Sequence, residues 1–93
     1  MASFGDRISL SRDIIYRDLG GEMVALNLQT GQYYGLDPVG ARMLQTLTET
    51  GRFESALELL LREYDVSAPT LREDLSRLVE ELITNGILQV DPA

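Results

Sequence analysis

The feature that most constrains the fold is a change of hydrophobic period within residues 29–41, which read QTGQYYGLDPVGA. Before this stretch, apolar and polar residues alternate in short runs, as in strands with one buried face. After it, apolar residues recur at spacings of three and four, which is typical of amphipathic helices. The stretch therefore contains the last strand of a small sheet and the start of the first helix. A chain in which strands come first and helices follow belongs to the α+β class.

Two strands are expected before this stretch, at residues 14–16 and 23–28. The first segment is β-branched and aromatic and is bounded by charged residues. Gly20-Gly21 lie between the segments and suit a two-residue hairpin turn, whose central positions need positive φ. Residues 23–28 alternate as in a half-buried strand. The two faces of that strand carry Val24, Leu26 and Leu28 on one side and Ala25 and Asn27 on the other.

A third strand is expected over residues 32–36, after a turn at 29–31 that ends in a glycine of positive φ. Tyr34 and Leu36 then lie on one face of this strand and Tyr33 on the other. Three strands joined by two tight turns form an antiparallel meander, whose apolar side needs helices to cover it. The third strand is short and lies at an edge, so its outer N–H and C=O groups are open to an extended peptide.

Three helices are expected after the strands. The first, over residues 37–51, begins with aspartate as the N-cap and proline at the first position, and it ends in glycine. The second is expected over 53–64, and the third over 67–86, from a cap at Ser67 or a neighbouring residue to an Asn-Gly stop. Their apolar stripes have helical spacing: Val39, Met43, Leu44 and Leu47 in the first; Phe53, Ala56, Leu57, Leu60, Leu61 and Tyr64 in the second; and Leu71, Leu75, Leu78, Val79, Leu82 and Ile83 in the third.

The two ends of the chain are less clearly patterned. Residues 1–11 are expected to form a flexible N-terminal arm and residues 12–90 a single domain, in which 87–90 add a strand or pack under the helices.

Among 93 residues, 44% are hydrophobic and 25% charged, as in an ordinary globular domain. The chain has no run of about 18 apolar residues and no secretory signal. It also has no cysteine, so we expect a cytoplasmic protein without a membrane span.

The absence of histidine and cysteine limits the kinds of metal site and catalysis that the chain can support. The sequence has neither His nor Cys, so it lacks the usual ligands of transition metals and the commonest general base of enzymes. It also lacks a glycine-rich phosphate motif and the acidic spacing of a calcium loop. We therefore expect no catalytic residue, no metal site and no cofactor, and a role in binding rather than in catalysis.

The net charge of −7 argues against nucleic acid as the partner. A DNA-binding winged-helix regulator is one alternative for this order of elements, and its recognition helix would carry basic residues. Residues 70–85 hold two arginines against four acidic residues, and the turn at 29–32 holds no basic residue. The DNA-binding alternative is thus disfavoured. A structural subunit of an enzyme complex, which binds no free peptide, is a second alternative that composition does not separate from peptide binding.

Several short patterns, taken in order, give the chain a resemblance to a known family. They are Arg12-Asp13-Ile14, Gly20-Gly21-Glu22, Leu26-Asn27, the runs 30–36 and 37–41, Tyr64-Asp65-Val66 and Gly86-Ile87-Leu88. This set, between Ser11 and Val90, resembles the PqqD-like family of leader-peptide recognition elements, which serve the pathways of ribosomally made, modified peptides. The resemblance implies a winged helix-turn-helix fold with a three-stranded antiparallel sheet followed by three helices.

The resemblance also implies a function. Members of the family bind the leader of a precursor peptide as an extra strand, antiparallel to the third strand, in a groove against the third helix. They present the precursor to a modifying enzyme such as a radical SAM enzyme, a protease or a cyclase, for instance in pyrroloquinoline quinone or lasso-peptide pathways. The implied peptide-binding residues of this chain are Gln32, Tyr33, Tyr34, Gly35, Leu36, Leu71, Asp74, Leu75 and Leu78.

Several of these residues also have a plainer structural interpretation. One of the two tyrosines can cap the core and the other can cover the outer face of the sheet, and Leu75 and Leu78 can be ordinary core. Asp74 can be a solvated charge, or it can pair with a Lys or Arg of the peptide at the margin of the groove. Gly35 can mark a bulge or a bend, or it can allow another backbone to approach closely. An exposed sheet edge also permits a dimer.

Overall fold

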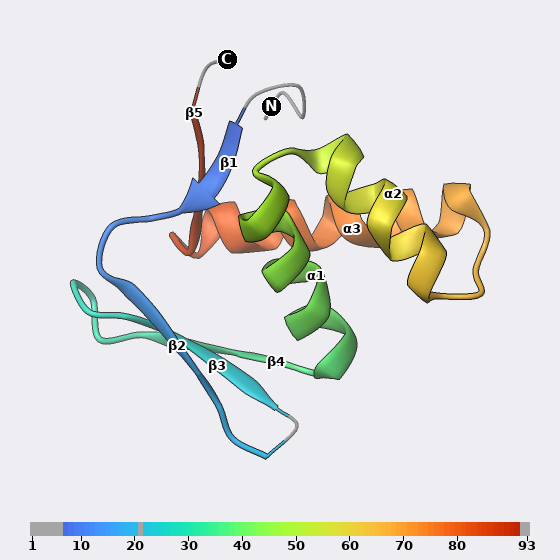
Figure 1. Ribbon diagram of the computed structural model, residues 1–93. Coiled ribbons are helices and arrows are strands. Elements are labelled where there is room, and N and C mark those ends of the chain that lie inside the picture. The colour runs from blue at the N-terminus through green and yellow to red at the C-terminus, as the bar shows by residue number, and fades with distance from the viewer. Residues whose placement is uncertain (1–6, 21, 92–93) are drawn as a thin grey trace.

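The computed structural model describes residues 7–20 and 22–91. In chain order the elements are β1 (Arg7–Leu10), β2 (Ile14–Asp18), β3 (Met23–Asn27), β4 (Tyr33–Leu36), α1 (Pro38–Thr50), α2 (Phe53–Glu63), α3 (Ala68–Thr84) and β5 (Leu88–Asp91). The strands β2, β3 and β4 form a three-stranded antiparallel sheet in that order (Figure 1). The expected α+β architecture, in which this sheet is followed by three helices, is confirmed.

Tight turns hold the three strands of this sheet together. Gly20 has a φ of 74°, and the Leu19 N–H donates to the Glu22 carbonyl at 2.6 Å, which closes the turn between β2 and β3. Gly21, which is expected to share this turn, lies outside the described residues. In the second turn Gly31 has a φ of 75°, as expected for a position that favours glycine.

Local capping fixes where the helices begin. The Asp37 side chain accepts a hydrogen bond from the Gly40 N–H at 2.7 Å, so α1 starts directly after β4 ends. A Cβ at Gly40 would lie 3.2 Å from the capping oxygen of Asp37, which explains why the smallest residue suits this position. Ser67 caps α3 in the same way, through a 3.3 Å hydrogen bond from the Thr70 N–H. Both predicted N-caps are thus confirmed.

The helices supply most of the core. Its largest fully buried side chains are Ile8, Leu44, Thr46, Leu47, Phe53, Leu60, Leu75, Val79, Leu82 and Leu88. Val39 departs from the predicted stripe of α1, because its side chain is 44% exposed. Thr46 is buried instead, and its hydroxyl donates to the Arg42 carbonyl at 2.8 Å, so the buried oxygen is paired.

The ends of the described chain differ from expectation. The sequence predicts a flexible arm over residues 1–11, but Arg7–Leu10 form β1, which pairs antiparallel with β5. Ile8 is only 1% exposed, and its N–H donates to the Gly51 carbonyl at 2.7 Å. The four-residue strand is too short to show a pattern, and its partner lies at the other end of the sequence. Residues 1–6 of the predicted arm lie outside the described residues.

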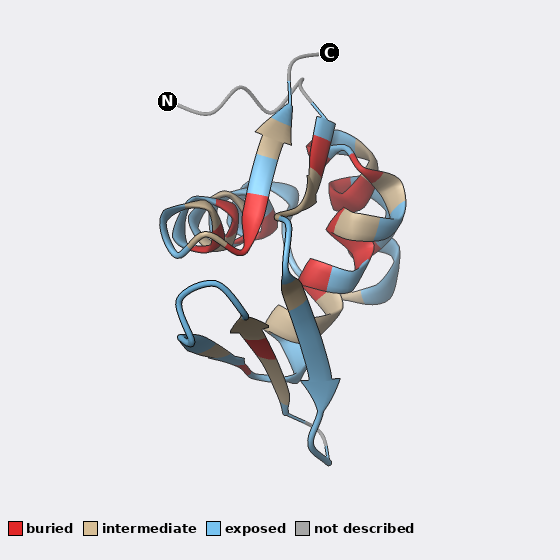
Figure 2. Ribbon diagram, turned by 90° about the vertical axis from the view of Figure 1, so that its left-hand side faces the viewer, coloured by how far each residue is buried: buried red, intermediate tan, exposed pale blue. Residues whose placement is uncertain are grey.

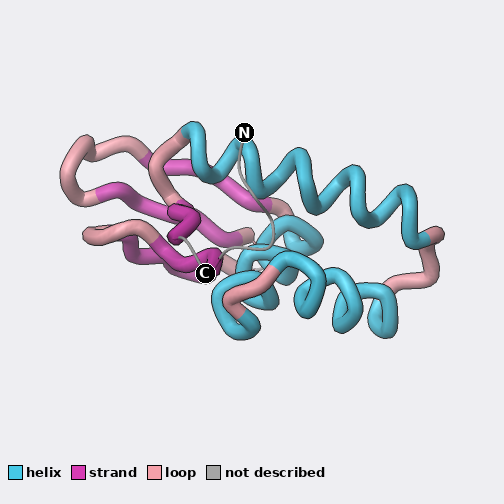
Figure 3. The backbone as a smooth tube through the Cα atoms, turned by 90° about the horizontal axis from the view of Figure 1, so that it is seen from above, coloured by secondary structure: helices cyan, strands magenta, loops and turns pink. Residues whose placement is uncertain are grey.

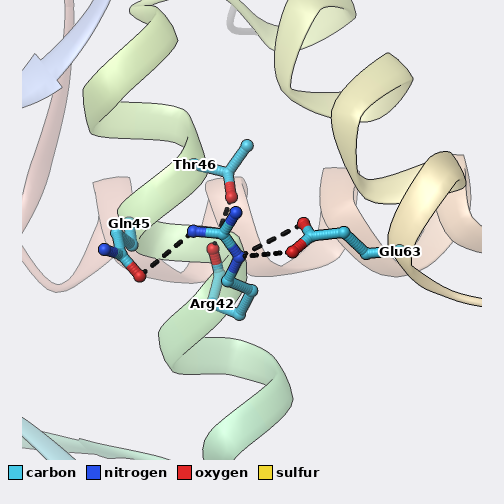
Figure 4. Close-up of polar contacts among 4 residues, drawn as sticks. All are labelled: Arg42, Gln45, Thr46 and Glu63. Atoms are coloured by element: carbon cyan, nitrogen blue, oxygen red, sulfur yellow. Dashed lines mark hydrogen bonds and ion pairs between the residues drawn. The ribbon is translucent and has the colours of Figure 1, made fainter.

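The helices are also joined at the surface. Arg42 of α1 donates from Nε to both carboxylate oxygens of Glu63, at 3.0 and 3.2 Å, and it donates from a terminal nitrogen to Gln45 (Figure 4). The hydrogen bond to Glu63 raises the pKa of Arg42.

Seen from above, the strands lie together beside the C-terminal half of α3 (Figure 3). This arrangement places one edge of the three-stranded sheet next to that helix.

Candidate functional site

The strand β4 lies at the edge of its sheet, with β3 on one side and no described strand on the other. The Asn27 N–H donates to the Gln32 carbonyl at 2.9 Å, so Asn27 and Gln32 form a hydrogen-bonded pair next to the ladder of β3 and β4. Because hydrogen-bonded pairs alternate in an antiparallel ladder, Tyr34 faces β3 with its main chain, whereas Tyr33 and Gly35 turn theirs to the open edge. These two residues offer the donors and acceptors that an added strand requires.

The strand is regular along this edge. Its register with β3 runs without interruption from Tyr33 opposite Leu26 to Leu36 opposite Met23. The interpretation of Gly35 as a bulge or a bend is therefore wrong. A Cβ at Gly35 would meet no other atom within 4 Å, so the described chain itself does not require glycine here. The remaining interpretation, close approach by another backbone, is still a prediction.

Two hollows lie beside the exposed flank of α3, the first against the start of β4 and the second against the start of α1. The first has a volume of about 430 Å³ and is lined by Asn27, Gly31, Gln32, Tyr33, Tyr34, Asn85 and Ile87. The second has a volume of about 270 Å³ and is lined by Asp37, Val39, Gly40, Met43, Asp74, Arg77, Leu78 and Glu81. We call the two hollows together the groove. The N-terminal end of β4, the N-terminal half of α1 and the exposed flank of α3 contribute to it.

A hydrogen bond between Tyr34 and Glu81 joins the strand to the helix inside the groove. The Tyr34 hydroxyl donates to the Glu81 carboxylate at 2.5 Å. Tyr34 borders the first hollow and Glu81 the second, so this bond links a residue of one hollow to a residue of the other. The hydrogen bond to Glu81, then partial burial, then the charge of Glu81 all raise the pKa of Tyr34. The tyrosine therefore stays protonated, and remains a donor, at neutral pH.

The helical wall of the groove is a single stripe on α3. Its residues are Asp74, Arg77, Leu78, Glu81 and Asn85, at i, i+3, i+4, i+7 and i+11. This spacing places all five on one face of the helix. Sequence analysis identified only two of them, Asp74 and Leu78. Extending the same spacing along the helix from Asp74 would have found the others, but only the position of β4 shows that this face borders a groove.

The two hollows differ in chemistry. Asn27, Gln32 and Asn85 give the first hollow neutral amides. The second has apolar walls, and its charged lining comprises three carboxylates and Arg77. Arg77 forms an ion pair with Asp74, with 2.6 Å between the guanidinium nitrogen and the carboxylate oxygen. Within the described part of the chain, the carboxylates of Asp37 and Glu81 form no ion pair, which suits a peptide of neutral or basic character rather than nucleic acid.

The predicted site residues fall into two groups. Gln32, Tyr33 and Tyr34 line the first hollow, Gly35 lies on the open edge, and Asp74 and Leu78 line the second hollow. The other three are buried in the core: Leu36 is 5% exposed, Leu71 3% and Leu75 0%. Their side chains leave almost no surface for a ligand, so the plainer interpretation describes these leucines. The wide apolar stripe of α3 faces the hydrophobic core and meets the groove only at Leu78.

Other kinds of site find little support in residues 7–20 and 22–91. No three His, Cys, Asp or Glu side chains there are grouped so that they could hold a metal ion. None of the helices in those residues is both long and apolar enough to cross a membrane.

Comparisons with known proteins agree with this geometry. The sequence model of the family described as coenzyme PQQ synthesis protein D (PqqD) matches residues 22–88. The chain is similar to the solved structure "TbiB1 in Complex with the TbiA(beta) Leader Peptide", with 34% identity, 87% of this chain and 94% of that chain covered, and a TM-score of 0.81. It is also similar to "Lasso peptide synthetase B1 complexed with the leader peptide", with 25% identity, 89% and 98% covered, and a TM-score of 0.81. No curated protein sequence matches the chain.

Proposed function

This chain belongs to the PqqD family, and from that premise we propose that it binds the leader of a ribosomally made precursor peptide as a fourth strand beside β4. The observation that carries the proposal is the open edge of β4, which lies along a groove walled by α3. Strand addition gives main-chain hydrogen bonds for affinity and side-chain pockets for specificity. The two similar structures, each of a protein with a leader peptide, support a leader peptide as the ligand.

The geometry of β4 defines how the leader would lie. An antiparallel leader strand exchanges hydrogen bonds with the main chain of Tyr33 and Gly35, because these residues turn to the open edge. Alternate leader side chains then point towards α3. The side chains opposite Leu36 and Gln32 enter the second and the first hollow, and the one between them lies over the hydrogen bond of Tyr34. The leader thus enters at the acidic hollow and leaves at the hollow lined by amides.

We also propose that the domain itself performs no catalysis and presents the precursor to a separate modifying enzyme. The sequence holds no His or Cys, and the groove offers carboxylates, amides and one tyrosine hydroxyl. These groups bind and orient a peptide. A radical SAM enzyme, a protease or a cyclase would act on the part of the precursor that emerges from the groove.

A matched pair of variants at Gly35 tests strand addition. Gly35→Pro removes the outward N–H, whereas Gly35→Ala keeps this donor and places its Cβ in open space. The probe is a synthetic leader of the precursor encoded beside the gene of this chain, titrated by calorimetry without any enzyme. We expect Gly35→Ala to bind like the wild type and Gly35→Pro to bind roughly 2- to 13-fold more weakly, the effect of one hydrogen bond of about 0.5–1.5 kcal/mol.

The same titration separates the alternatives. If the wild-type protein binds no such leader, the chain is better described as a structural subunit of an enzyme complex. If both Gly35 variants bind equally well while folded, the peptide does not pair with this edge. Tight binding to duplex DNA, with a steep dependence on salt, would instead favour the regulator.

A further inference from the structure

The face of the β2–β3–β4 sheet that turns away from the helices is apolar. It carries a hollow of about 230 Å³ lined by Ile15, Arg17, Leu19, Val24, Leu26 and Tyr33, which we call the outer patch. All of these residues except Arg17 are aliphatic or aromatic. Figure 2 shows β2 exposed along most of its length, and no described helix covers this face in Figure 1.

The outer patch is not needed for the core. Ala25 of β3 points inwards and is fully buried, whereas its larger neighbours Val24 and Leu26 point outwards. Ile15 is 41% exposed and Tyr33 76%. An antiparallel sheet with one wet face usually carries polar residues on that face. A contiguous apolar face on an otherwise charged domain is typical of a surface that binds another molecule.

The outer patch is continuous with the open edge of β4. Ile15 pairs with Leu26, and Leu26 pairs with Tyr33, so these three side chains form one row across the strands. The row ends at Tyr33, whose main chain turns to the open edge. A strand added beside β4 would extend this row by one outward side chain. Another protein that docked on the outer patch would therefore contact both the domain and its bound peptide.

Area and charge decide what occupies the patch. Six residues form a patch on the order of 300–600 Å², which is the usual size of the largest apolar patch on a monomer. A stable dimer buries about 800 Å² on each partner, so a second copy of the chain would gain too little here. The outward side chains of a bound peptide would enlarge the contact for a third protein. Arg17 gives the patch a positive charge in a chain of net charge −7.

We propose that the outer patch docks the modifying enzyme, through an apolar surface of that enzyme that carries a carboxylate opposite Arg17. This inference rests on the proposed function, because the enzyme must approach a precursor that is held at β4. It assigns separate surfaces to the two partners. The peptide occupies the edge and the groove, and the enzyme covers the outer face.

Charged substitutions on β2 and its turn test the proposal away from the peptide site. Ile15→Glu and Leu19→Glu alter the outer patch at the strand farthest from the open edge. The matched control is Leu59→Glu on α2, where a leucine that is 38% exposed lies outside the patch. The probes are the synthetic leader, titrated alone, and a purified peptide-modifying enzyme encoded beside the gene, titrated into the protein with and without saturating leader. We expect the two patch variants to weaken enzyme binding about tenfold or more and to leave leader binding unchanged, whereas the control changes neither.

Three results would overturn the proposal. Unchanged enzyme binding by both folded patch variants would show that the enzyme docks elsewhere. A parallel loss of leader binding would show that the patch belongs to the peptide site. A wild-type dimer in sedimentation that Ile15→Glu converts to a monomer would make a second copy the occupant. Failure of the proposed function gives a different result. The wild-type protein would then bind no leader, whereas its binding to the enzyme would still be measured in its own titration.

Discussion

The two faces of α3 differ in burial and in role. One face carries Leu71, Leu75, Val79 and Leu82, all buried in the hydrophobic core. The other carries the stripe Asp74, Arg77, Leu78, Glu81 and Asn85, which lines the groove. Because both stripes follow the same helical period, the difference lies in what each face meets. Packing requires the first stripe to be apolar, whereas the neighbouring strand edge gives the second its function.

The largest expected effect is on the buried face. Leu75→Ala removes a side chain with 0% exposure and leaves a cavity, so we expect the free energy of unfolding to fall by about 2–5 kcal/mol. Urea denaturation followed by circular dichroism measures this loss. The matched control is Leu78→Ala, on the half-buried border with the groove. An equal loss at both positions would mean that the two faces are not distinct in packing.

The next effect is on the groove face. Leu78→Ala removes an apolar wall of the second hollow, and we expect leader binding to weaken by about 1 kcal/mol, or roughly fivefold. Calorimetric titration with the synthetic leader measures it. Arg62→Ala on α2 is the control, because it lies outside the groove. Wild-type affinity in the Leu78 variant would show that the peptide does not reach this hollow.

A smaller effect concerns the link between β4 and α3. Tyr34→Phe removes the hydrogen bond to Glu81, and we expect the free energy of unfolding to fall by about 1 kcal/mol or less, because the bond is partly exposed. The pKa of Tyr34 is raised in the folded protein from its ordinary value of 10.0. The contribution is therefore fully present below about pH 10 and is lost as the pH rises through the raised pKa.

Two measurements check this pH dependence. The stability difference between the wild type and Tyr34→Phe should be constant from about pH 7 to 9 and shrink above about pH 10. In an absorbance titration, the raised pKa of Tyr34 should give a tyrosine transition above the ordinary value of 10.0, and this late transition should vanish in the variant. A late transition that survives in Tyr34→Phe would belong to another tyrosine.

The smallest effect is expected at the exposed ion pair of the groove face. Arg77→Ala breaks the ion pair with Asp74, in which the Arg77 side chain is 63% exposed and the Asp74 side chain 48% exposed. Such pairs contribute little because solvent screens them, so we expect a stability change below about 0.5 kcal/mol. Urea denaturation at low and high salt measures it. A loss as large as that of Leu75→Ala would contradict the division of α3 into a packing face and a groove face.

Local signals made much of the fold predictable. Aspartate and serine caps gave the starts of α1 and α3, the positive-φ glycines gave the turns, and the helical spacing gave most of the core. The resemblance based on ordered short patterns is confirmed by the family match over residues 22–88. These features are predictable because each depends on residues a few positions apart.

Long-range features were not predictable in the same way. The strand β1 was missed, because Arg7–Leu10 pair with β5 at the other end of the described chain. Leu71 and Leu75 were placed in the groove, although they are buried, because periodicity does not state which neighbour a helix face meets. Val39 was placed in the core although it is exposed, because it lies in the first turn of α1 at the rim of the second hollow.

The sequence by itself determined the order of strands and helices, the capped starts of α1 and α3, and the absence of His and Cys chemistry. These follow from local hydrogen bonding, local backbone preference and composition. Only the tertiary structure decided that β4 has an open edge beside α3, which side chains line the groove, and that Val24 and Leu26 of β3 face outwards. Those features depend on which distant surfaces pack together, because burial is a property of the whole folded chain.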